Sequence, residues 1–324
     1  MIHKILLTGT VSFLLVWLLV PKTIPFLTKL KFGQVVREEG PSTHYAKTGT
    51  PTMGGVVFIL SIIFVYSLFI DKQTEVAILI IATLGLGGVG FLDDYIKVVK
   101  KRNLGLRAYQ KIIGQIIFAG MLVGYQFFIS EMGGRIYIPI LNEVINLGYL
   151  YFPFAIIVVI GIVNSVNLTD GLDGLASGVT IVFLFFLGSI FYLAENTIMI
   201  NENFFLIIAT GIGSLIGFLV FNKYPARIFM GDVGSLALGG LVASLMILTG
   251  TVIIFPILGA VFMAETLSVV IQVVVFKRTG RRVFLMSPLH HHYEQKGFTE
   301  KEVVRKFWLV SVVFGCVSVV LFLI

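Results

Sequence analysis

Cysteine and charged residues are scarce in this chain of 324 residues. The single cysteine, Cys316, excludes an intramolecular disulfide framework and a thiolate metal cluster. It lies in an apolar stretch, so we interpret it as a small packing residue. Only 13% of the residues are charged, 57% are hydrophobic, and the mean hydropathy is +0.99. These values exclude an ordinary soluble domain and indicate a polytopic membrane protein.

Apolar stretches fill most of the chain, and about 20 apolar residues cross a bilayer as a helix. We predict an all-α membrane protein with about ten transmembrane helices in one bundle, as a single domain over residues 1–324. The first stretch has no small-residue cleavage site and runs into a basic loop, so we interpret it as a retained helix rather than a signal peptide. The predicted spans are 4–20, 52–70, 76–92, 110–129, 150–166, 174–194, 203–221, 233–250, 252–276 and 303–323.

Lysine and arginine are distributed unevenly around these spans. Three of the 24, Lys4, Lys72 and Arg135, fall on one side, and the other 21 fall on the opposite side. The positive-inside rule makes the richer side cytoplasmic and places both termini outside. The net charge of +7 is then concentrated on one face, which suits anionic lipid headgroups and anionic substrates. The predicted cytoplasmic loops are 21–51, 93–109, 167–173, 222–232 and 277–302.

Residues 135–149 differ from the spans on either side. Their apolar and polar residues alternate, and they include Pro139 and Asn142. This pattern predicts a short outward hairpin or an interfacial segment, to which we assign no chemistry. The basic residues of the chain are interrupted by membrane spans, so a continuous surface for nucleic acid is not expected.

Five of the six aspartates lie at ends of apolar stretches on the predicted cytoplasmic side: Asp93, Asp94, Asp170, Asp173 and Asp232. Carboxylates are costly at a lipid boundary, so their gathering indicates that a cation and a phosphorylated substrate share the charge. Adjacent carboxylates such as Asp93 and Asp94 repel each other unless a cation binds or one is protonated. The structural alternatives are a solvated helix end for this pair and helix capping for Asp170 or Asp232.

Three consecutive histidines, His290, His291 and His292, follow the ninth predicted span. Three neighbours in a regular element cannot all bind one ion, and no cysteine accompanies them, so a zinc site is not expected. Imidazoles beside a phosphate suit hydrogen bonding, charge stabilisation or proton transfer, and a solvated polar loop is the alternative. Glu265 lies within the ninth span, where it either faces a functional cavity or bonds to a neighbouring helix.

Four of the five stretches that follow carry these aspartates and histidines: Pro41 to Gly55, Phe91 to Tyr95, Asn164 to Leu175, Asn222 to Leu236 and Ser287 to Gly297. With them, essentially the whole chain closely resembles the bacterial phospho-N-acetylmuramoyl-pentapeptide transferases, within the superfamily of polyprenyl-phosphate sugar-1-phosphate transferases. The aspartate motifs are shared across that superfamily. The stretches HYAKTGTPTMGG and PLHHHYEQKG point more narrowly to its muramoyl-pentapeptide branch.

The resemblance implies a multi-pass enzyme of the bacterial cytoplasmic membrane with its active site on the cytoplasmic face. Its reaction would transfer phospho-MurNAc-pentapeptide from UDP to undecaprenyl phosphate, giving lipid I and UMP for peptidoglycan synthesis, with Mg²⁺ required. The chemistry agrees, because Mg²⁺ can offset the repulsion of two phosphates through one or two carboxylates and substrate oxygens. The expected partners are UDP-MurNAc-pentapeptide, undecaprenyl phosphate and the lipid bilayer, without nucleic acid, and a homodimer is the candidate assembly.

The resemblance also implies roles for single residues. Asp232 is the first choice for the magnesium ligand, and Asp170 is the second. Asp93 and Asp94 would assist the lipid phosphate by deprotonating it or by holding its cation, and His291 joins them as a catalytic candidate. The expected substrate-binding residues are Lys47, Thr52, Asn167, Asp170, Asp173, Phe229 (stacked on uracil), Gln272, His290 and His292.

Two other functions stay open from the residues. A sibling transferase would use UDP-N-acetylglucosamine with the same lipid, although PLHHHYEQKG argues against it. A cation or proton transporter would place acids along a path near the bilayer midplane, whereas only Glu265 lies deep in a span. For the transferase, we favour direct attack by the lipid phosphate over a covalent intermediate on an aspartate, because an anionic phosphate is already a nucleophile.

Overall fold

The structure is a computed structural model that describes residues 1–30, 47, 49–100, 105–141, 143–193 and 200–323. Residues 41–46 and 48 of the first predicted motif lie outside the described residues. Within the described ranges, nine helices are long and apolar enough to cross a membrane, and α2 is apolar but has only 15 residues. These ten helices confirm the predicted all-α bundle: α1 (Ile2–Lys29), α2 (Gly55–Phe69), α3 (Thr74–Val99), α4 (Ala108–Phe128), α5 (Tyr151–Thr169), α6 (Leu175–Leu193), α7 (Glu202–Asn222), α8 (Gly231–Leu248), α10 (Ala260–Thr279) and α12 (Glu300–Leu323).

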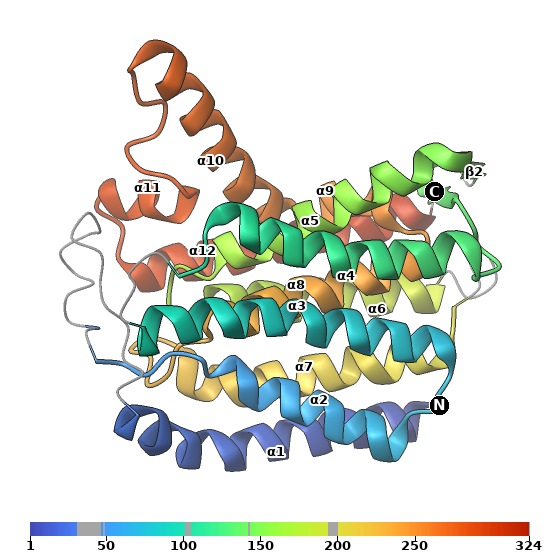
Figure 1. The fold of residues 1–324 in the computed structure, drawn as a ribbon, viewed down its shortest axis with the longest axis horizontal. Helices are drawn as coiled ribbons and strands as arrows, with labels where there is room; N and C mark the ends of the chain where they lie inside the picture. The colour runs from blue at the N-terminus through green and yellow to red at the C-terminus, as the bar shows by residue number, and fades with distance from the viewer. Residues whose placement is uncertain (31–46, 48, 101–104, 142, 194–199, 324) are drawn as a thin grey trace.

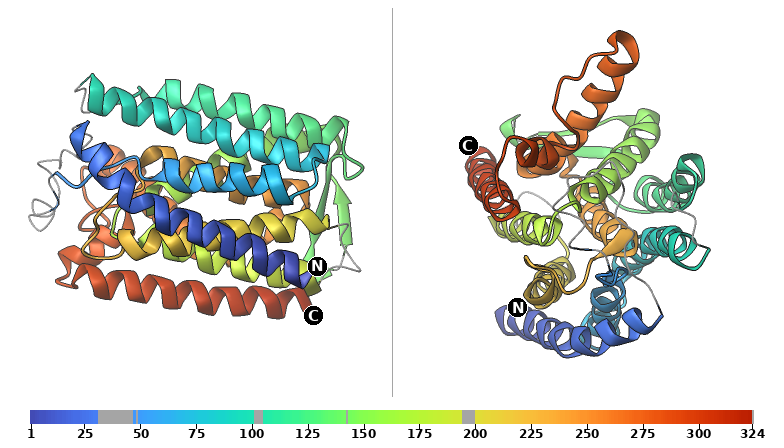
Figure 2. Two further views of the ribbon diagram at one scale, coloured as in Figure 1. Left: turned by 90° about the horizontal axis from the view of Figure 1, so that it is seen from below. Right: turned by 90° about the vertical axis from the view of Figure 1, so that its left-hand side faces the viewer.

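Helix α8 is the most enclosed of these helices. Every residue from Val233 to Leu248 is buried, and α3, α5, α2 and α4 pack around it (Figure 2). Its sequence is apolar on all sides and rich in glycine, alanine and serine, which lets neighbouring backbones come close. Helix α3 runs along α8 and helix α1 runs along α7 (Figure 1).

The two ends of the bundle differ in what they carry. The amino end of α1 and the carboxyl end of α12 lie at the same end (Figures 1 and 2). Strands β1 (Arg135–Ile138) and β2 (Glu143–Asn146) form an antiparallel hairpin at this end, which confirms the hairpin predicted for 135–149. The opposite end gathers the last turn of α3, the start of α8 and the short helix α11 (Leu289–Gln295).

Helix α1 is longer than its predicted span 4–20. It continues through Pro21 and Pro25 to Lys29, into a segment predicted to be a cytoplasmic loop. The predicted span ended before Pro21, and proline removes one backbone hydrogen bond from a helix. The helix nevertheless continues, and Lys29 in its last turn complements the negative end of the helix dipole.

The ninth predicted span, 252–276, is not one continuous helix. A 3₁₀ helix (Val252–Ile254) and the four-residue α9 (Phe255–Leu258) precede α10, which begins at Ala260 and runs to Thr279. Pro256 lies in the first turn of α9, where its missing N–H costs no hydrogen bond. The far half of α10 projects away from the other helices (Figure 1). The loop predicted over 277–302 contains the helix α11.

Candidate active site

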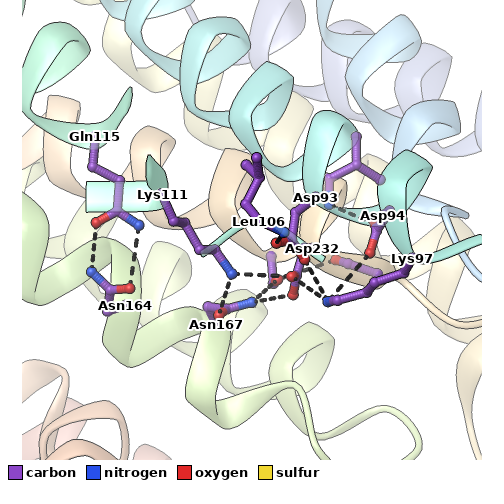
Figure 3. Close-up of polar contacts among 12 residues, drawn as sticks. Asp93, Asp94, Lys97, Leu106, Lys111, Gln115, Asn164, Asn167 and Asp232 are labelled. Carbon is purple, nitrogen blue, oxygen red and sulfur yellow. Dashed lines mark hydrogen bonds and ion pairs between the residues drawn. The ribbon is translucent and has the colours of Figure 1, made fainter. Parts of the chain in front are cut away.

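Three carboxylates meet where the carboxyl end of α3 contacts the start of α8. Asp93 and Asp94 lie near the carboxyl end of α3, and Asp232 lies in the first turn of α8. One oxygen from each of the three lies within 4.8 Å of the others (Figure 3). Asp93 and Asp94 are 2% and 4% exposed, so these charges are enclosed by protein rather than solvated. The sequence prediction that acids from separate helices gather here therefore holds for these three residues.

The close crossing of α3 and α8 depends on Gly90. A Cβ atom at this position would lie 2.1 Å from the backbone oxygen of Asp232, which is far inside van der Waals contact. With glycine there, the backbone of α3 touches the first turn of α8. Asp94 Oδ2 then accepts a hydrogen bond of 3.0 Å from the backbone N–H of Val233. The acidic pair is thus joined directly to the start of α8.

Two lysines balance part of the negative charge. Lys97 Nζ lies 2.5 Å from Asp93 Oδ2 and 2.7 Å from Asp232 Oδ2. Lys111 Nζ, from helix α4, lies 3.0 Å from the same Asp232 oxygen. With all three carboxylates ionised, the two ammonium groups would leave one negative charge in a largely enclosed site. Enclosed charges need opposite charges close by, so this arrangement favours an additional cation.

Helix α5 contributes an amide to the same cluster. Asn167 Nδ2 donates hydrogen bonds of 2.8 Å to Asp232 Oδ1 and 2.8 Å to Ser235 Oγ. Asn164 lies on α5, about one helical turn before Asn167. It forms a reciprocal pair of amide hydrogen bonds with Gln115 of α4, 2.7 and 3.2 Å long (Figure 3). These contacts fix α4 and α5 beside α8 and orient the Asp232 carboxylate.

The three carboxylates could hold a metal ion. Mg²⁺ prefers hard oxygen ligands and is usually bound by one or two carboxylates together with substrate phosphates. The ammonium group of Lys97 contacts oxygens of both Asp93 and Asp232, which shows that these oxygens already face a common point. In the described part of the chain, Asp170 is not a member of this group of three.

A second charged cluster lies around the turn between α5 and α6. Lys47 Nζ lies 2.6 Å from Asp173 Oδ1 and 2.6 Å from Glu300 Oε1. Burial alone would lower the pKa of Lys47, but Glu300 and Asp173 outweigh burial and raise this pKa above its usual value. Glu300 Oε1 also accepts from the backbone N–H of Asp173 at 2.7 Å, and Asp173 Oδ2 accepts from Ala226 N–H at 2.9 Å.

Glu300 was missing from the predicted site residues. The sequence did contain a signal for it, because Glu300 begins the last helix at the same predicted boundary as the aspartates. Phe229 lies close to this cluster, with Lys47 Nζ 5.9 Å from the centre of its ring. Thr52 is buried beside the start of α8, next to the hydrogen bond from Phe229 N–H to the carbonyl of Pro51.

Asp170 lies between the two clusters, immediately after α5. Its carboxyl group is partly buried, and burial raises its pKa to about 7, with further contributions from the charges of Asp232 and Asp173. These contributions place Asp170 within electrostatic range of both clusters. A group that titrates near neutrality can exchange its proton for a cation or a ligand contact.

The remaining predicted residues lie around α10 and α11. Gln272 Oε1 accepts from the backbone N–H groups of Val283 and Phe284, at 3.0 and 2.9 Å. His292 Nδ1 accepts from Leu285 N–H at 3.2 Å, and burial lowers the pKa of His292, as does Lys296. The side chains of Gln272 and His292 therefore hold residues 283–285, in the segment that joins α10 to α11. Within the described residues, these hydrogen bonds do not reach the three carboxylates.

His290 and His291 lie side by side in α11, with ring centres 4.1 Å apart. His291 Nδ1 lies 2.8 Å from Glu294 Oε2. His290 is 1% exposed and contacts Glu265 of α10, which places the histidine motif and the intramembrane acid in one network. Of the two alternatives for Glu265, the structure shows the contact with a neighbouring helix, but its partner His290 was not predicted.

The fold is that of a multi-pass membrane protein with an acidic cluster at one end, and comparisons with known proteins identify its class as a transferase. The model of glycosyl transferase family 4 matches residues 76–250, which cover nearly all of α3 to α8. The phospho-N-acetylmuramoyl-pentapeptide-transferase signature 1 matches residues 47–59, which include Lys47 and Thr52.

Curated relatives match almost the whole chain. The phospho-N-acetylmuramoyl-pentapeptide-transferase of Clostridioides difficile is 46% identical over 319 residues, 98% of each chain. The protein of that name from Heliobacterium modesticaldum is 48% identical over 93% of this chain and 92% of its own, and that from Halalkalibacterium halodurans is 46% identical over 98% and 97%. The chain belongs to the phospho-N-acetylmuramoyl-pentapeptide-transferase family, and it is a phosphotransferase of peptidoglycan synthesis.

Proposed function

We propose that this enzyme transfers phospho-MurNAc-pentapeptide from UDP-MurNAc-pentapeptide to undecaprenyl phosphate, forming lipid I and UMP with Mg²⁺. The observation that carries the proposal is the meeting of Asp93, Asp94 and Asp232 at one end of an apolar bundle. A water-soluble nucleotide sugar and a lipid phosphate have to meet at such a boundary. The names of the relatives support the muramoyl-pentapeptide donor over UDP-N-acetylglucosamine.

The three carboxylates are the residues that would hold magnesium, with Asp232 as the principal ligand. When bound there, the ion supplies positive charge that offsets the repulsion between the two phosphates. Lys97 and Lys111 add positive charge on the same side, and Asn167 keeps Asp232 in its orientation. These residues bind and align the phosphates through non-covalent contacts and form no covalent bond to them.

Direct attack by the lipid phosphate is the mechanism that we favour. A phosphate oxygen of undecaprenyl phosphate forms the new P–O bond, the old P–O bond to UMP breaks, and UMP leaves with the electron pair. Asp93, Asp94 and Asp232 already bind lysines or backbone N–H groups, which suits carboxylates that bind cations rather than attack phosphorus. Stoichiometric UMP release in a single turnover without the lipid would instead indicate a covalent intermediate.

The nucleotide is proposed to bind beside the Lys47 cluster. Phe229 is partly exposed beside Lys47, and its ring is our candidate for stacking on uracil. Asp170 and Asp173 lie in the adjacent turn. The other proposed substrate contacts are Thr52, Gln272, His290, His291 and His292.

The site end of the bundle is proposed to face the cytoplasm, and the end with both helix termini is proposed to face outward. The 21 lysines and arginines predicted on the inner side support this orientation through the positive-inside rule. The bacterial cytoplasmic membrane is the location that we propose, in agreement with the family resemblance and the apolar helices. The single domain over 1–324 and the homodimer stay predictions.

The decisive experiment measures UMP release by purified protein with both substrates, with and without Mg²⁺. We expect Asp232→Asn to reduce release by about 100-fold or more, because the main ligand charge is lost. The matched control is Asp71→Asn, an exposed aspartate just before α3, which should retain wild-type activity. Magnesium-independent release, or full activity in Asp232→Asn, contradicts the proposal. Faster release from UDP-N-acetylglucosamine indicates the sibling transferase.

A further inference from the structure

Glu265 and His290 form a completely enclosed pair. Glu265 is 0% exposed in α10, and His290 is 1% exposed in α11. His290 Nδ1 lies 3.1 Å from Glu265 Oε1, and the backbone N–H of His290 donates to Glu265 Oε2 at 3.4 Å. A buried carboxylate needs such partners, because it pays a high desolvation cost without them. Both carboxylate oxygens of Glu265 therefore hold one residue, His290.

An ionised Glu265 would fix which imidazole nitrogen of His290 carries the proton. An ionised carboxylate can only accept hydrogen bonds, so the nitrogen that faces it must be protonated. In a neutral imidazole with a proton on Nδ1, the other nitrogen, Nε2, is a hydrogen-bond acceptor. Among the described residues, Nε2 of His290 has no hydrogen-bond partner, although it is buried.

The free nitrogen is directed at the turn that follows α5. A Cβ atom placed on Gly171 would lie 2.2 Å from His290 Nε2 and 2.6 Å from Cε1. Only glycine leaves room for the imidazole at this position. Gly171 lies between Asp170 and Asp173, which we have placed in the nucleotide site. An acceptor that is buried, unpaired and aimed at this turn is suited to a ligand that donates a hydrogen bond.

We propose that Glu265 is a positioning residue of the transferase: it holds the His290 imidazole with its proton on Nδ1, so that Nε2 accepts a hydrogen bond from a hydroxyl or N–H group of the bound nucleotide sugar. A phosphate oxygen does not fit this role, since an ionised phosphate accepts hydrogen bonds. The identity of the ligand rests on the proposed function, whereas the position of the proton does not.

The first test reads the proton position directly, in substrate-free protein. Nitrogen-15 NMR of protein labelled in its five histidines distinguishes a protonated from an unprotonated ring nitrogen, and His290→Asn identifies the signal by its loss. At a pH where the ring is neutral, we expect His290 to be protonated on Nδ1. In Glu265→Gln, the side-chain amide can donate to Nδ1, so the proton should move to Nε2. A wild-type ring protonated on Nε2, or an unchanged ring in Glu265→Gln, overturns the proposal.

The second test adds ligands to the labelled wild-type protein. A change of the Nε2 signal with UMP assigns the donor group to the nucleoside. A change only with UDP-MurNAc-pentapeptide assigns it to the sugar or the peptide. No change with either compound, at concentrations that saturate binding, overturns the acceptor role of Nε2.

The third test separates positioning from folding by steady-state kinetics. We expect Glu265→Gln to lower kcat/KM for the nucleotide sugar by about 10- to 100-fold, the usual effect of losing a group that orients a ligand-binding side chain. KM for undecaprenyl phosphate should stay unchanged. Gly171→Ala should give the same selective loss with Glu265 intact, because its Cβ displaces the imidazole.

The matched control is Ser268→Ala, which removes another buried polar group from α10. It should keep both KM values. Equal losses for the two substrates in Glu265→Gln and Gly171→Ala would reduce Glu265 to a structural role and overturn the proposal. If wild-type protein does not transfer at all, the proposed function fails, while the NMR result for Glu265 and His290 still stands.

Discussion

The ammonium group of Lys97 lies 2.7 Å from the carboxylate of Asp232, which is 135 positions further along the chain. The same ammonium lies 2.5 Å from Asp93 Oδ2 and 3.9 Å from Asp94 Oδ1. A single lysine therefore contacts all three acids of the proposed metal site. Because Lys97 neutralises the oxygens that a divalent cation would use, the lysine and the cation act on the same charges.

This contact predicts an effect of Lys97→Met on magnesium binding. Removal of the ammonium makes the electrostatic potential at the three acids more negative, so we expect Mg²⁺ affinity to rise by about tenfold, equivalent to ~1.4 kcal/mol. Without Mg²⁺, the variant should melt at a lower temperature than wild type, because the acids repel each other. Thermal unfolding in detergent with Mg²⁺ or EDTA measures both effects.

Lys100→Met is the control, since Lys100 is exposed at the carboxyl end of α3. It should leave the magnesium-dependent stabilisation unchanged. Weaker magnesium binding in Lys97→Met would show that Lys97 supports the ion rather than competing with it.

Two glycines of α3 provide a matched test of the helix crossing. A Cβ atom at Gly90 would lie 2.1 Å from the backbone oxygen of Asp232, whereas one at Gly88 would meet nothing within 4 Å. Gly90→Ala should destabilise the protein by about 1–3 kcal/mol, as overpacking does, and should reduce transfer by separating α3 from α8. Gly88→Ala should be neutral or stabilise by at most about 1 kcal/mol. Equal behaviour of the two variants would mean that the crossing tolerates a wider separation.

Much of the fold could be predicted from the sequence, because membrane spans are read from composition over long windows. All ten predicted spans contain helices, and the hairpin at 135–149 is present. The errors are local. The first predicted span ended at residue 20 although α1 continues to Lys29, and the single span 252–276 did not mark the break at Gly259 between α9 and α10. Hydropathy measures how apolar a segment is, and it contains no information on where a helix bends.

The candidate site was only partly predictable. The aspartates were recognisable because acids at span ends are few, and three of them do meet. Their lysine partners were not predicted as site residues, since a sequence does not show that Lys97 and Lys111 turn toward Asp232. The contacts of Glu265 with His290, 25 positions apart, and of Lys47 with Glu300, 253 positions apart, likewise arise from tertiary packing.

The contact between Lys47 and Glu300 predicts a role for this acid in nucleotide binding. Glu300→Gln keeps an oxygen for the backbone N–H of Asp173 but removes the charge that faces Lys47. We expect KM for UDP-MurNAc-pentapeptide to rise by about tenfold, the effect of losing one charge-assisted hydrogen bond, with little change in kcat. Glu302→Gln, two residues further on and exposed, is the control and should keep the wild-type KM. An unchanged KM in Glu300→Gln would show that Lys47 is held adequately by Asp173.

Asp170 predicts how the stability of the metal-free protein depends on pH. Burial, together with Asp232 and Asp173, raises the pKa of Asp170 to about 7 from its usual value near 3.8. Between these two values the folded state holds a proton that the unfolded state has lost, so the free energy of unfolding falls as pH rises from about 4 to 7. In EDTA, the apparent melting temperature of wild type should therefore decrease over this range. Asp170→Asn has no proton to lose and should show a smaller decrease. An equal slope in both proteins would assign the pH dependence to other groups.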